Sequence, residues 1–373
     1  MFYHANWGNS LRELHRVHPD VRFLKDAYEG LLHYARWLDR ERDPEGSGLC
    51  DIHNHYETGQ EYMHRYIAVD PRADRDNWGK IFRLKGVDAT VYLYELKKTL
   101  AWAAAKIHRR ETEIARLRRS AEQVRSAILE KMWDPKTEMF YDVDSSTGKR
   151  TRVKAAVCFY PYMTDIVSPS HLNGFEKHLL NPREFWTPFP VPSSSADDPY
   201  FSADAVWKGR RMNCPWNGRV WPMTNSHIAE ALALCAIRFG SDRLKSASVE
   251  FIGKFVRMMF SDNDPRRPNC FEHYHPLTGE PSLYRGIDDY QHSWVNDLLL
   301  KYVCGVRPID GKVVVDPFPF PMHYVHVKGC IVQGHEFRVE REGNRFQVWM
   351  DGKRCSESVV GTPVVIEVGS PQG

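Results

Sequence analysis

The sequence predicts a mainly α-helical protein with a small antiparallel β region at its C-terminal end. Apolar residues recur at helical spacing up to about residue 305, and beyond that point apolar and polar residues alternate. Two long connections between helical stretches also hold carboxylates among aromatic residues and glycine, at residues 55–61 (HYETGQE) and 270–279 (CFEHYHPLTG). Long connections within a compact domain are usually functional, so these two stretches are the first candidates for a site.

Nine segments carry the helical pattern. It is clearest in residues 22–41, where Leu24, Tyr28 and Leu32 fall on one face. The nine segments are residues 10–18, 22–41, 87–108, 111–133, 155–167, 172–180, 225–239, 242–260 and 290–304. Between the fourth and fifth segments, residues 134–148 predict a β-hairpin.

The C-terminal residues carry the strand pattern. Val313 and Val315 alternate with polar neighbours, and residues 342–344 (EGN) supply a hairpin turn. This stretch is too short for an independent sandwich, so we expect a small β cap packed on the helical domain. The predicted domains are therefore residues 1–305 and residues 306–373.

Composition excludes several classes of function. A hydrophobic content of 42% with 27% charged residues is ordinary for a globular protein, and a net charge of +3 gives no field that favours nucleic acid. No stretch approaches the roughly 20 apolar residues of a membrane span. The eight cysteines form no CxxC pair, and the first residues lack the pattern of a secretion signal. We therefore expect reduced thiols, a cytoplasmic location, and neither nucleic-acid nor membrane partners.

Five motifs follow one another between residues 20 and 305. They are residues 42–61 (with RDPEGSG and ETGQE), 86–89 (GVDA), 216–221 (WNGRVW), 272–279 (EHYHPLTG) and 292–294 (HSW). In this order they resemble the signature motifs of six-hairpin, α/α-barrel glycoside hydrolases. The most similar groups are family 63 α-glucosidases, mannosylglycerate hydrolases and trehalases. The resemblance implies a carbohydrate substrate and no cofactor.

The resemblance also implies a fold, an (α/α)6 toroid of twelve helices. In that plan the catalytic acid follows the fifth helix and the base follows the eleventh. Only two predicted helices precede Glu61, so the count implies that the first three helices are absent and that the chain is a partial copy of a longer enzyme. Apolar helix faces left uncovered in this way would favour self-association through exposed barrel faces.

Two catalytic residues carry over from the family. The resemblance implies that Glu61 is the general acid and Glu272 the general base, acting with inversion on an α-glucoside or α-mannoside. The family has Asp at the first position, whereas this chain has Glu. Glu57 is the alternative acid, and an ion pair between Glu61 and Arg65 is the structural alternative to catalysis. Inversion requires carboxyl groups roughly 6.5–9.5 Å apart, which leaves room for a water molecule.

Aromatic and polar residues near the motifs are candidate sugar contacts. The predicted substrate-binding residues are Tyr56, Glu57, Trp78, Asp88, Trp207, Trp216, Asn217, Arg219, Trp221, His292 and Trp294. The tryptophans could equally be core residues, and Asp88 could equally cap a helix. Lys85 and Asp289 are further candidates for a cleft.

Two competing hypotheses remain open. The pairs His53/His55 and His273/His275, each beside a glutamate, have the composition of a zinc or iron site. The resemblance explains both carboxylates without a metal, so we predict none. The stretch 142–148 has acidic residues typical of a calcium loop, but its glycine is wrongly spaced, which favours a hairpin. From another class, the chain could be a catalytically silent sugar-binding fragment.

Overall fold

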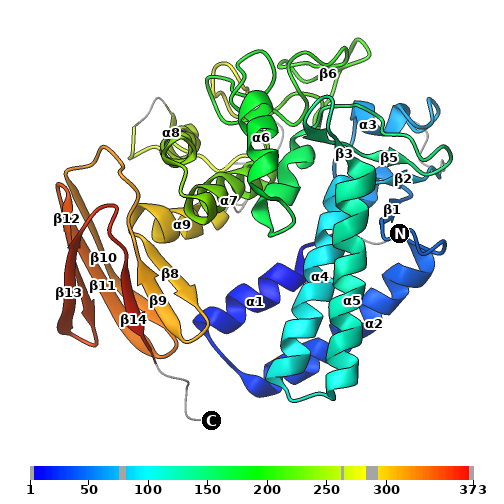
Figure 1. The fold of residues 1–373 in the computed structure, drawn as a ribbon. Helices are drawn as coiled ribbons and strands as arrows, with labels where there is room; N and C mark the ends of the chain where they lie inside the picture. The colour runs from blue at the N-terminus through cyan, green and yellow to red at the C-terminus, as the bar shows by residue number, and fades with distance from the viewer. Residues whose placement is uncertain (1–3, 75–80, 262–263, 283–292, 369–373) are drawn as a thin grey trace. The chain divides into compact units, whose positions relative to one another are not determined.

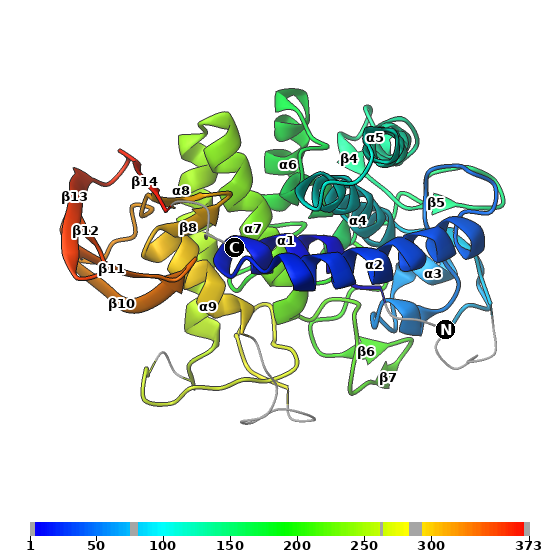
Figure 2. The same ribbon diagram turned by 90° about the horizontal axis from the view of Figure 1, so that it is seen from below.

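The computed structural model describes residues 4–74, 81–261, 264–282 and 293–368 (Figures 1 and 2). The chain is mainly helical and ends in antiparallel strands, as predicted. It divides into two compact units, the first made of residues 1–8 and 30–292 and the second of residues 9–29 and 293–373. The strands of the second unit begin at Val306, where the sequence pattern changes. This unit also contains two helical stretches, within residues 9–29 and within residues 293–303.

Helices α1 (Trp7–Val17) and α2 (Val21–Glu41) each contain a boundary between the two units. The boundary in α1 follows Gly8, and the boundary in α2 precedes Gly30. Both follow the predicted segments within three residues. Within the described residues, no helix is both long enough and apolar enough to cross a lipid bilayer.

The first unit is organised around helix α4 (Val87–Lys106), which is buried on most of its circumference. It packs against α5 (Glu111–Ala127) and against a 3₁₀ helix at Ala156–Met163. That 3₁₀ helix packs in turn on α7 (Pro222–Phe239). Figures 1 and 2 both show α4 and α5 side by side. Paired helices therefore form the core of this unit.

A second helical pair, α7 and α8 (Asp242–Met258), is joined by a tight link. Gly240 ends α7 in the left-handed conformation with φ = 62°, which glycine adopts without steric cost. Ser241 then caps α8, because its side chain accepts a hydrogen bond from the Leu244 amide. Pro222 occupies the first turn of α7, a position that suits proline, and marks a start three residues earlier than we predicted.

The α-helix predicted at residues 155–167 is wrong. These residues form the 3₁₀ helix Ala156–Met163, with Pro161 inside it. Proline lacks an amide hydrogen, and its ring clashes with the carbonyl four residues earlier in an α-helix. Almost all residues of this segment are buried, as their apolar character predicts. The error lies in the type of helix, which is 3₁₀ and not α.

Short elements connect the helices of the first unit. Helix α5 runs into a π-helical turn, and the stretch 134–148 holds two short turns in place of the one hairpin that we predicted: β3 (Trp133–Asp134) pairs with β4 (Met139–Phe140) across the first, and Val143 bridges Arg150 across the second. The remaining short elements are α3 (His64–Ile67), α6 (Leu172–Leu179), β1 (Asp51–Ile52), β2 (Leu84–Lys85), β5 (Val143–Asp144), β6 (Val206–Trp207) and β7 (Arg210–Arg211). Strands β1, β2 and β5 form one antiparallel sheet, and β6 pairs with β7.

The second unit contains two antiparallel sheets. One has the order β10 (Tyr324–Val332), β11 (His335–Glu342), β12 (Arg345–Met350) and β13 (Lys353–Val359). The other has the order β14 (Val364–Glu367), β9 (Lys312–Val315) and β8 (Val306–Ile309). The unit's last helix is α9 (Trp294–Leu298), which continues into a π-helical turn at Leu299–Val303.

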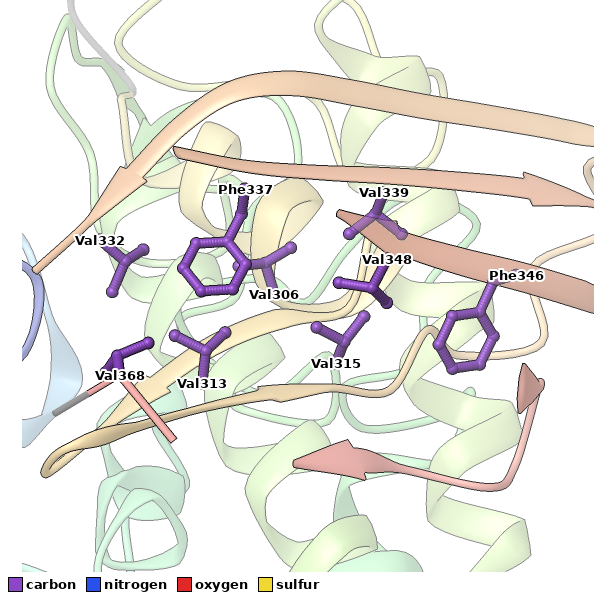
Figure 3. Packing of buried hydrophobic residues seen from close by; sticks show 9 residues of the cluster. All are labelled: Val306, Val313, Val315, Val332, Phe337, Val339, Phe346, Val348 and Val368. Carbon is purple, nitrogen blue, oxygen red and sulfur yellow. The ribbon is translucent and has the colours of Figure 1, made fainter. Parts of the chain in front are cut away.

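These two sheets enclose a common core (Figure 3). Phe337 and Val339 of one sheet and Val313 and Val315 of the other are at most 1% exposed. The predicted turn at residues 342–344 is confirmed, because Glu342 pairs with Arg345 across it. We expected a small β cap without predicting its internal arrangement, which is two sheets whose facing valine and phenylalanine side chains form one core.

Candidate active site

The first candidate carboxylate, Glu61, lies in a connection that is tied down on both sides. Gln60, just before it, has its side-chain oxygen 3.4 Å from Arg65 Nη1 and its nitrogen 3.4 Å from Asp88 Oδ2. Tyr62, just after it, has φ = 60°, which is rare for a residue with a bulky side chain. The carbonyl oxygen of Glu61 accepts a hydrogen bond of 3.0 Å from the Trp216 amide. The backbone at Glu61 is therefore fixed from several directions.

A fully buried arginine organises the base of this connection. Arg65 donates to both carboxylate oxygens of Asp88, at 2.8 and 2.9 Å, and to both of Asp142, at 2.7 and 2.8 Å. Burial works to raise the pKa of both carboxyls. The Arg65 charge outweighs burial at Asp88, whose pKa is lowered, but not at Asp142, whose pKa is raised. Asp142 also accepts from the Val87 amide and so caps α4.

This cluster corrects two sequence-based interpretations. Arg65 pairs with Asp88 and Asp142, so the structural alternative of a Glu61–Arg65 ion pair is wrong. Asp88, predicted as either a sugar ligand or a cap, is a buried ion-pair partner and only 2% exposed. The sequence could not show this, because Arg65 and Asp142 are 77 positions apart.

Glu57, the alternative acid, is also held in a structural ion pair. Its Oε1 lies 2.7 Å from Arg42 Nη2, and its Oε2 accepts a hydrogen bond of 2.9 Å from the His53 amide. The residue is buried, so both carboxylate oxygens serve the fold of the connection. Glu57 is therefore a poor candidate for an acid that must give up a proton.

The second candidate carboxylate, Glu272, is buried in the other connection. On its C-terminal side, Tyr274 forms a two-way backbone bridge with Val220, with both hydrogen bonds at 2.9 Å. His273 accepts a hydrogen bond of 3.0 Å from Arg219 Nε, and its other ring nitrogen lies 2.9 Å from the Asn213 carbonyl. Glu272 Oε1 lies 3.7 Å from the sulfur of Cys214.

One segment, residues 213–221, contacts both carboxylate-bearing connections. Trp216 binds the backbone of Glu61, whereas Cys214 contacts the side chain of Glu272. Gly218, with φ = 150°, lets this segment pass close to its neighbours, since a Cβ there would lie 2.6 Å from the Ser202 oxygen. The structure therefore brings Glu61 and Glu272, which are far apart in sequence, to the same short loop, where their contacts Trp216 and Cys214 are two positions apart.

A cavity of about 1060 Å³ adjoins this segment. Its wall includes Asn213, Arg219 and His273, and also Asp204, Arg211 and Glu280. The carboxylate of Glu272 is not part of this wall, although its neighbour His273 is. Burial lowers the pKa of Arg219 to about 10, so it remains charged at neutral pH. The volume and mixed charge suit a polar ligand of about disaccharide size.

Three of the tryptophans predicted to bind the sugar, Trp207, Trp216 and Trp221, are core residues of the first unit. Trp216 and Trp221 stack on each other with centroids 3.9 Å apart, and both are buried. Trp207 packs against Tyr200 at 5.4 Å and donates from its indole nitrogen to Asp74. These rings have little surface left for a sugar face, so their main role is packing.

The remaining predicted contacts fall into three groups. Asn217 is buried and donates to two loop carbonyls, and Lys85 lies among the carboxylates of Asp43 and Asp51, so both are structural. Tyr56 is half-buried in a short 3₁₀ helix, and Trp294 opens α9 in the second unit. Trp78, Asp289 and His292 lie outside the described residues.

The two histidine pairs serve separate structural contacts. His55 packs edge-on against Tyr66, with centroids 5.0 Å apart, whereas His275 lies 3.4 Å from Asp204. Across the described part of the chain there is no group of three or more His, Cys, Asp or Glu side chains placed to share a metal ion. Asp142 serves the Arg65 cluster, and Asp144 accepts from Ser146 and Thr147 in the hairpin turn.

Comparison with known proteins identifies the family. Residues 3–293 match the family described as the mannosylglycerate hydrolase MGH1-like glycoside hydrolase domain. The chain belongs to this glycoside hydrolase family. The resemblance of its motifs to family 63 and the six-hairpin glycosidases is thereby confirmed. The chain is 24% identical to a mannosylglycerate hydrolase from Rubrobacter radiotolerans over 76% of its own length and 69% of that protein.

Solved structures show the same fold. A GH63 mannosylglycerate hydrolase from Thermus thermophilus, in complex with glucose, matches 80% of this chain and 75% of its own. The TM-score is 0.63, at 20% sequence identity. A sialidase matches 97% of this chain with a TM-score of 0.79, at 16% identity, although the chain spans only 33% of that protein.

The sequence analysis missed two residues as partners within the candidate site, Cys214 and His273. His273 was considered only as a metal ligand, and Cys214 only as a buried thiol. His273 contacts Arg219, 54 positions away along the chain, and Cys214 contacts Glu272, 58 positions away. The only sequence signal was their position beside motif residues, which does not show a contact.

Buried neutral histidines should make this protein less stable in acid. Burial lowers the pKa of His4, His227 and His273 to about 4. An unfolded histidine binds a proton below about pH 6.5, whereas these three do not until about pH 4. Lowering the pH from 6.5 to 4 should therefore decrease the free energy of unfolding by up to about 3 kcal/mol for each histidine.

Urea unfolding at pH 7.0 and pH 4.5 measures this loss. His227→Gln should reduce the loss, whereas His18→Gln, at an exposed position, should leave it unchanged. Equal stability at the two pH values would contradict the assignment of neutral buried histidines.

Proposed function

We propose that this chain hydrolyses an α-glycosidic bond, in an α-mannoside or α-glucoside, with inversion at the anomeric carbon. In this proposal Glu61 is the general acid and Glu272 the general base. The observation that supports it is the shared contact of both residues with residues 213–221, through the Trp216 amide and the Cys214 sulfur. Mannosylglycerate is the first substrate to test, because relatives of this chain are hydrolases of that compound.

The proposed reaction uses these two carboxyl groups in one step. The carboxylate of Glu272 takes a proton from water, and the water oxygen attacks the anomeric carbon. The bond from that carbon to the aglycone oxygen breaks, and the carboxyl of Glu61 gives its proton to this oxygen. Arg219 and its neighbours in the cavity would hold polar groups of the substrate. The chemistry needs no cofactor.

We further propose that the helical part follows the (α/α)6 plan. Two observations support this plan. Helices pack in the pairs α4–α5 and α7–α8, and the 3₁₀ helix Ala156–Met163 packs against both α4 and α7. Three helices of the twelve-helix plan then have no counterpart among the residues that the structure describes.

Product stereochemistry tests the mechanism directly. Hydrolysis of an α-mannoside or α-glucoside, followed by proton NMR during the first minutes, should show the β-anomer of the free sugar before mutarotation. The α-anomer as first product would overturn inversion. Binding of the sugar without turnover, in protein that is folded by circular dichroism, would instead favour a silent sugar-binding fragment.

Self-association is a further expectation for the purified chain. Leu14, Val21 and Phe23, on α1 and α2, are each about half exposed, at 48%, 52% and 50%. Exposed apolar side chains of this size favour association. Light scattering after size-exclusion chromatography should therefore show a species heavier than the 43.4 kDa monomer.

The variant Phe23→Ser should shift this species toward the monomer. Val365→Ser replaces an equally exposed apolar residue on β14 and should leave the mass unchanged. A monomeric wild-type protein at all concentrations would contradict the expectation.

A further inference from the structure

The thiol of Cys214 faces the carboxylate of Glu272. The sulfur lies 3.7 Å from Glu272 Oε1, within reach of a hydrogen bond from S–H to a carboxylate. Cys214 is half-buried and Glu272 is buried, so little bulk water screens the contact. A thiol is a weak donor, but its bond to an ionised acceptor is stronger than one to a neutral acceptor.

The backbone on both sides of this contact is held in place. His273, which follows Glu272, lies 2.9 Å from the carbonyl of Asn213, which precedes Cys214. The other nitrogen of the same ring accepts a hydrogen bond from Arg219. Two adjacent residues of one connection thus contact two adjacent residues of the other. This double contact limits how far the Glu272 carboxylate and the Cys214 thiol can move apart.

We propose that Cys214 is a positioning residue for Glu272, holding the carboxylate of the base through the S–H contact. The inference rests on the base role proposed above for Glu272. In this assignment Cys214 acts on the base and has no direct role in the chemical step. The thiol fixes the orientation of the carboxylate that is to take the proton from water.

The same contact has an electrostatic consequence. A donor to the ionised form of a carboxyl favours that form, so loss of the thiol should raise the pKa of Glu272. Cys270 and His273 lie within two positions of Glu272 along the chain, and Arg219 contacts His273. Because all three remain in a Cys214 variant, the variant isolates the contribution of one thiol.

Steady-state kinetics over a pH range test the positioning role. Cys214→Ala should lower kcat/KM by about three- to tenfold and move the acidic limb of its pH profile to higher pH. Cys214→Ser restores a donor and should recover most of both effects. Cys270→Ala removes a half-buried thiol from the Glu272 connection and should match the wild type. A Cys214→Ala enzyme with wild-type rate and pH profile would overturn the inference.

A second measurement does not depend on turnover. Difference infrared spectroscopy against Glu272→Gln isolates the carboxyl band of Glu272, and its titration gives the pKa in each background. We expect a higher pKa in Cys214→Ala than in the wild type or in Cys214→Ser, and equal values would refute the contact. Activity retained by Glu272→Gln would count against the proposed function, whereas an unshifted carboxyl titration counts only against the role of Cys214.

Discussion

Replacement of Glu272 by glutamine is expected to lower kcat/KM by about 10²–10⁴-fold. The amide keeps the size and the hydrogen-bonding reach of the side chain but cannot take a proton from water. Glu272 is buried, but glutamine has the same size and a backbone bridge holds the connection beside it. The fold should therefore tolerate this change. Steady-state hydrolysis of aryl and alkyl α-glycosides measures the loss.

A matched control and the acid variant sharpen this experiment. Glu122→Gln alters an exposed glutamate on α5 and should retain full activity. Glu61→Gln should lose activity toward alkyl glycosides but keep much of it toward dinitrophenyl glycosides, because such a leaving group departs without a proton. Glu272→Gln should lose activity toward both. Full activity of Glu272→Gln would exclude it as the base.

Replacement of Arg65 by methionine should destabilise the protein by about 3–5 kcal/mol. Arg65 is fully buried between two buried carboxylates, Asp88 and Asp142. Methionine fills similar space but leaves both carboxylates without their cation. The free energy of unfolding, measured with urea at pH 7, reports this cost. Since Gln60 also bonds to this cluster, the variant should lose activity in parallel.

Two further variants distinguish the effect of losing a buried arginine from the effect of losing an arginine at the surface. Arg266→Met breaks the exposed pair with Asp264 and should change stability by less than about 0.5 kcal/mol. Adding Asp88→Asn and Asp142→Asn to Arg65→Met removes the uncompensated charges and should restore part of the stability. If Arg65→Met is as stable as the wild type, the buried cluster does not hold the connection that carries Glu61.

Local pattern was sufficient for most of the helices. Residues 22–41 and 242–260 have an apolar periodicity that shows which face of a helix is buried, so α2 and α8 could be predicted within two residues. The 3₁₀ helix at Ala156–Met163 could not, because a segment that is buried all round has no periodicity to reveal its backbone type. The core shared by the two C-terminal sheets could not be predicted for a related reason: alternation shows that a strand has an inner face but not which other strand covers it.

The amino-acid sequence by itself determined the helical pattern, the strand-rich end, the order of the motifs and the two glutamates that stand out within them. Only the tertiary structure decided what those side chains do. It assigned Glu57 to Arg42 and Asp88 to Arg65, it stacked Trp216 on Trp221, and it placed Cys214 against Glu272. The physical reason is that the role of a charged or aromatic side chain depends on its neighbours in space. Those neighbours come from distant parts of the chain, and periodicity and composition carry no record of them.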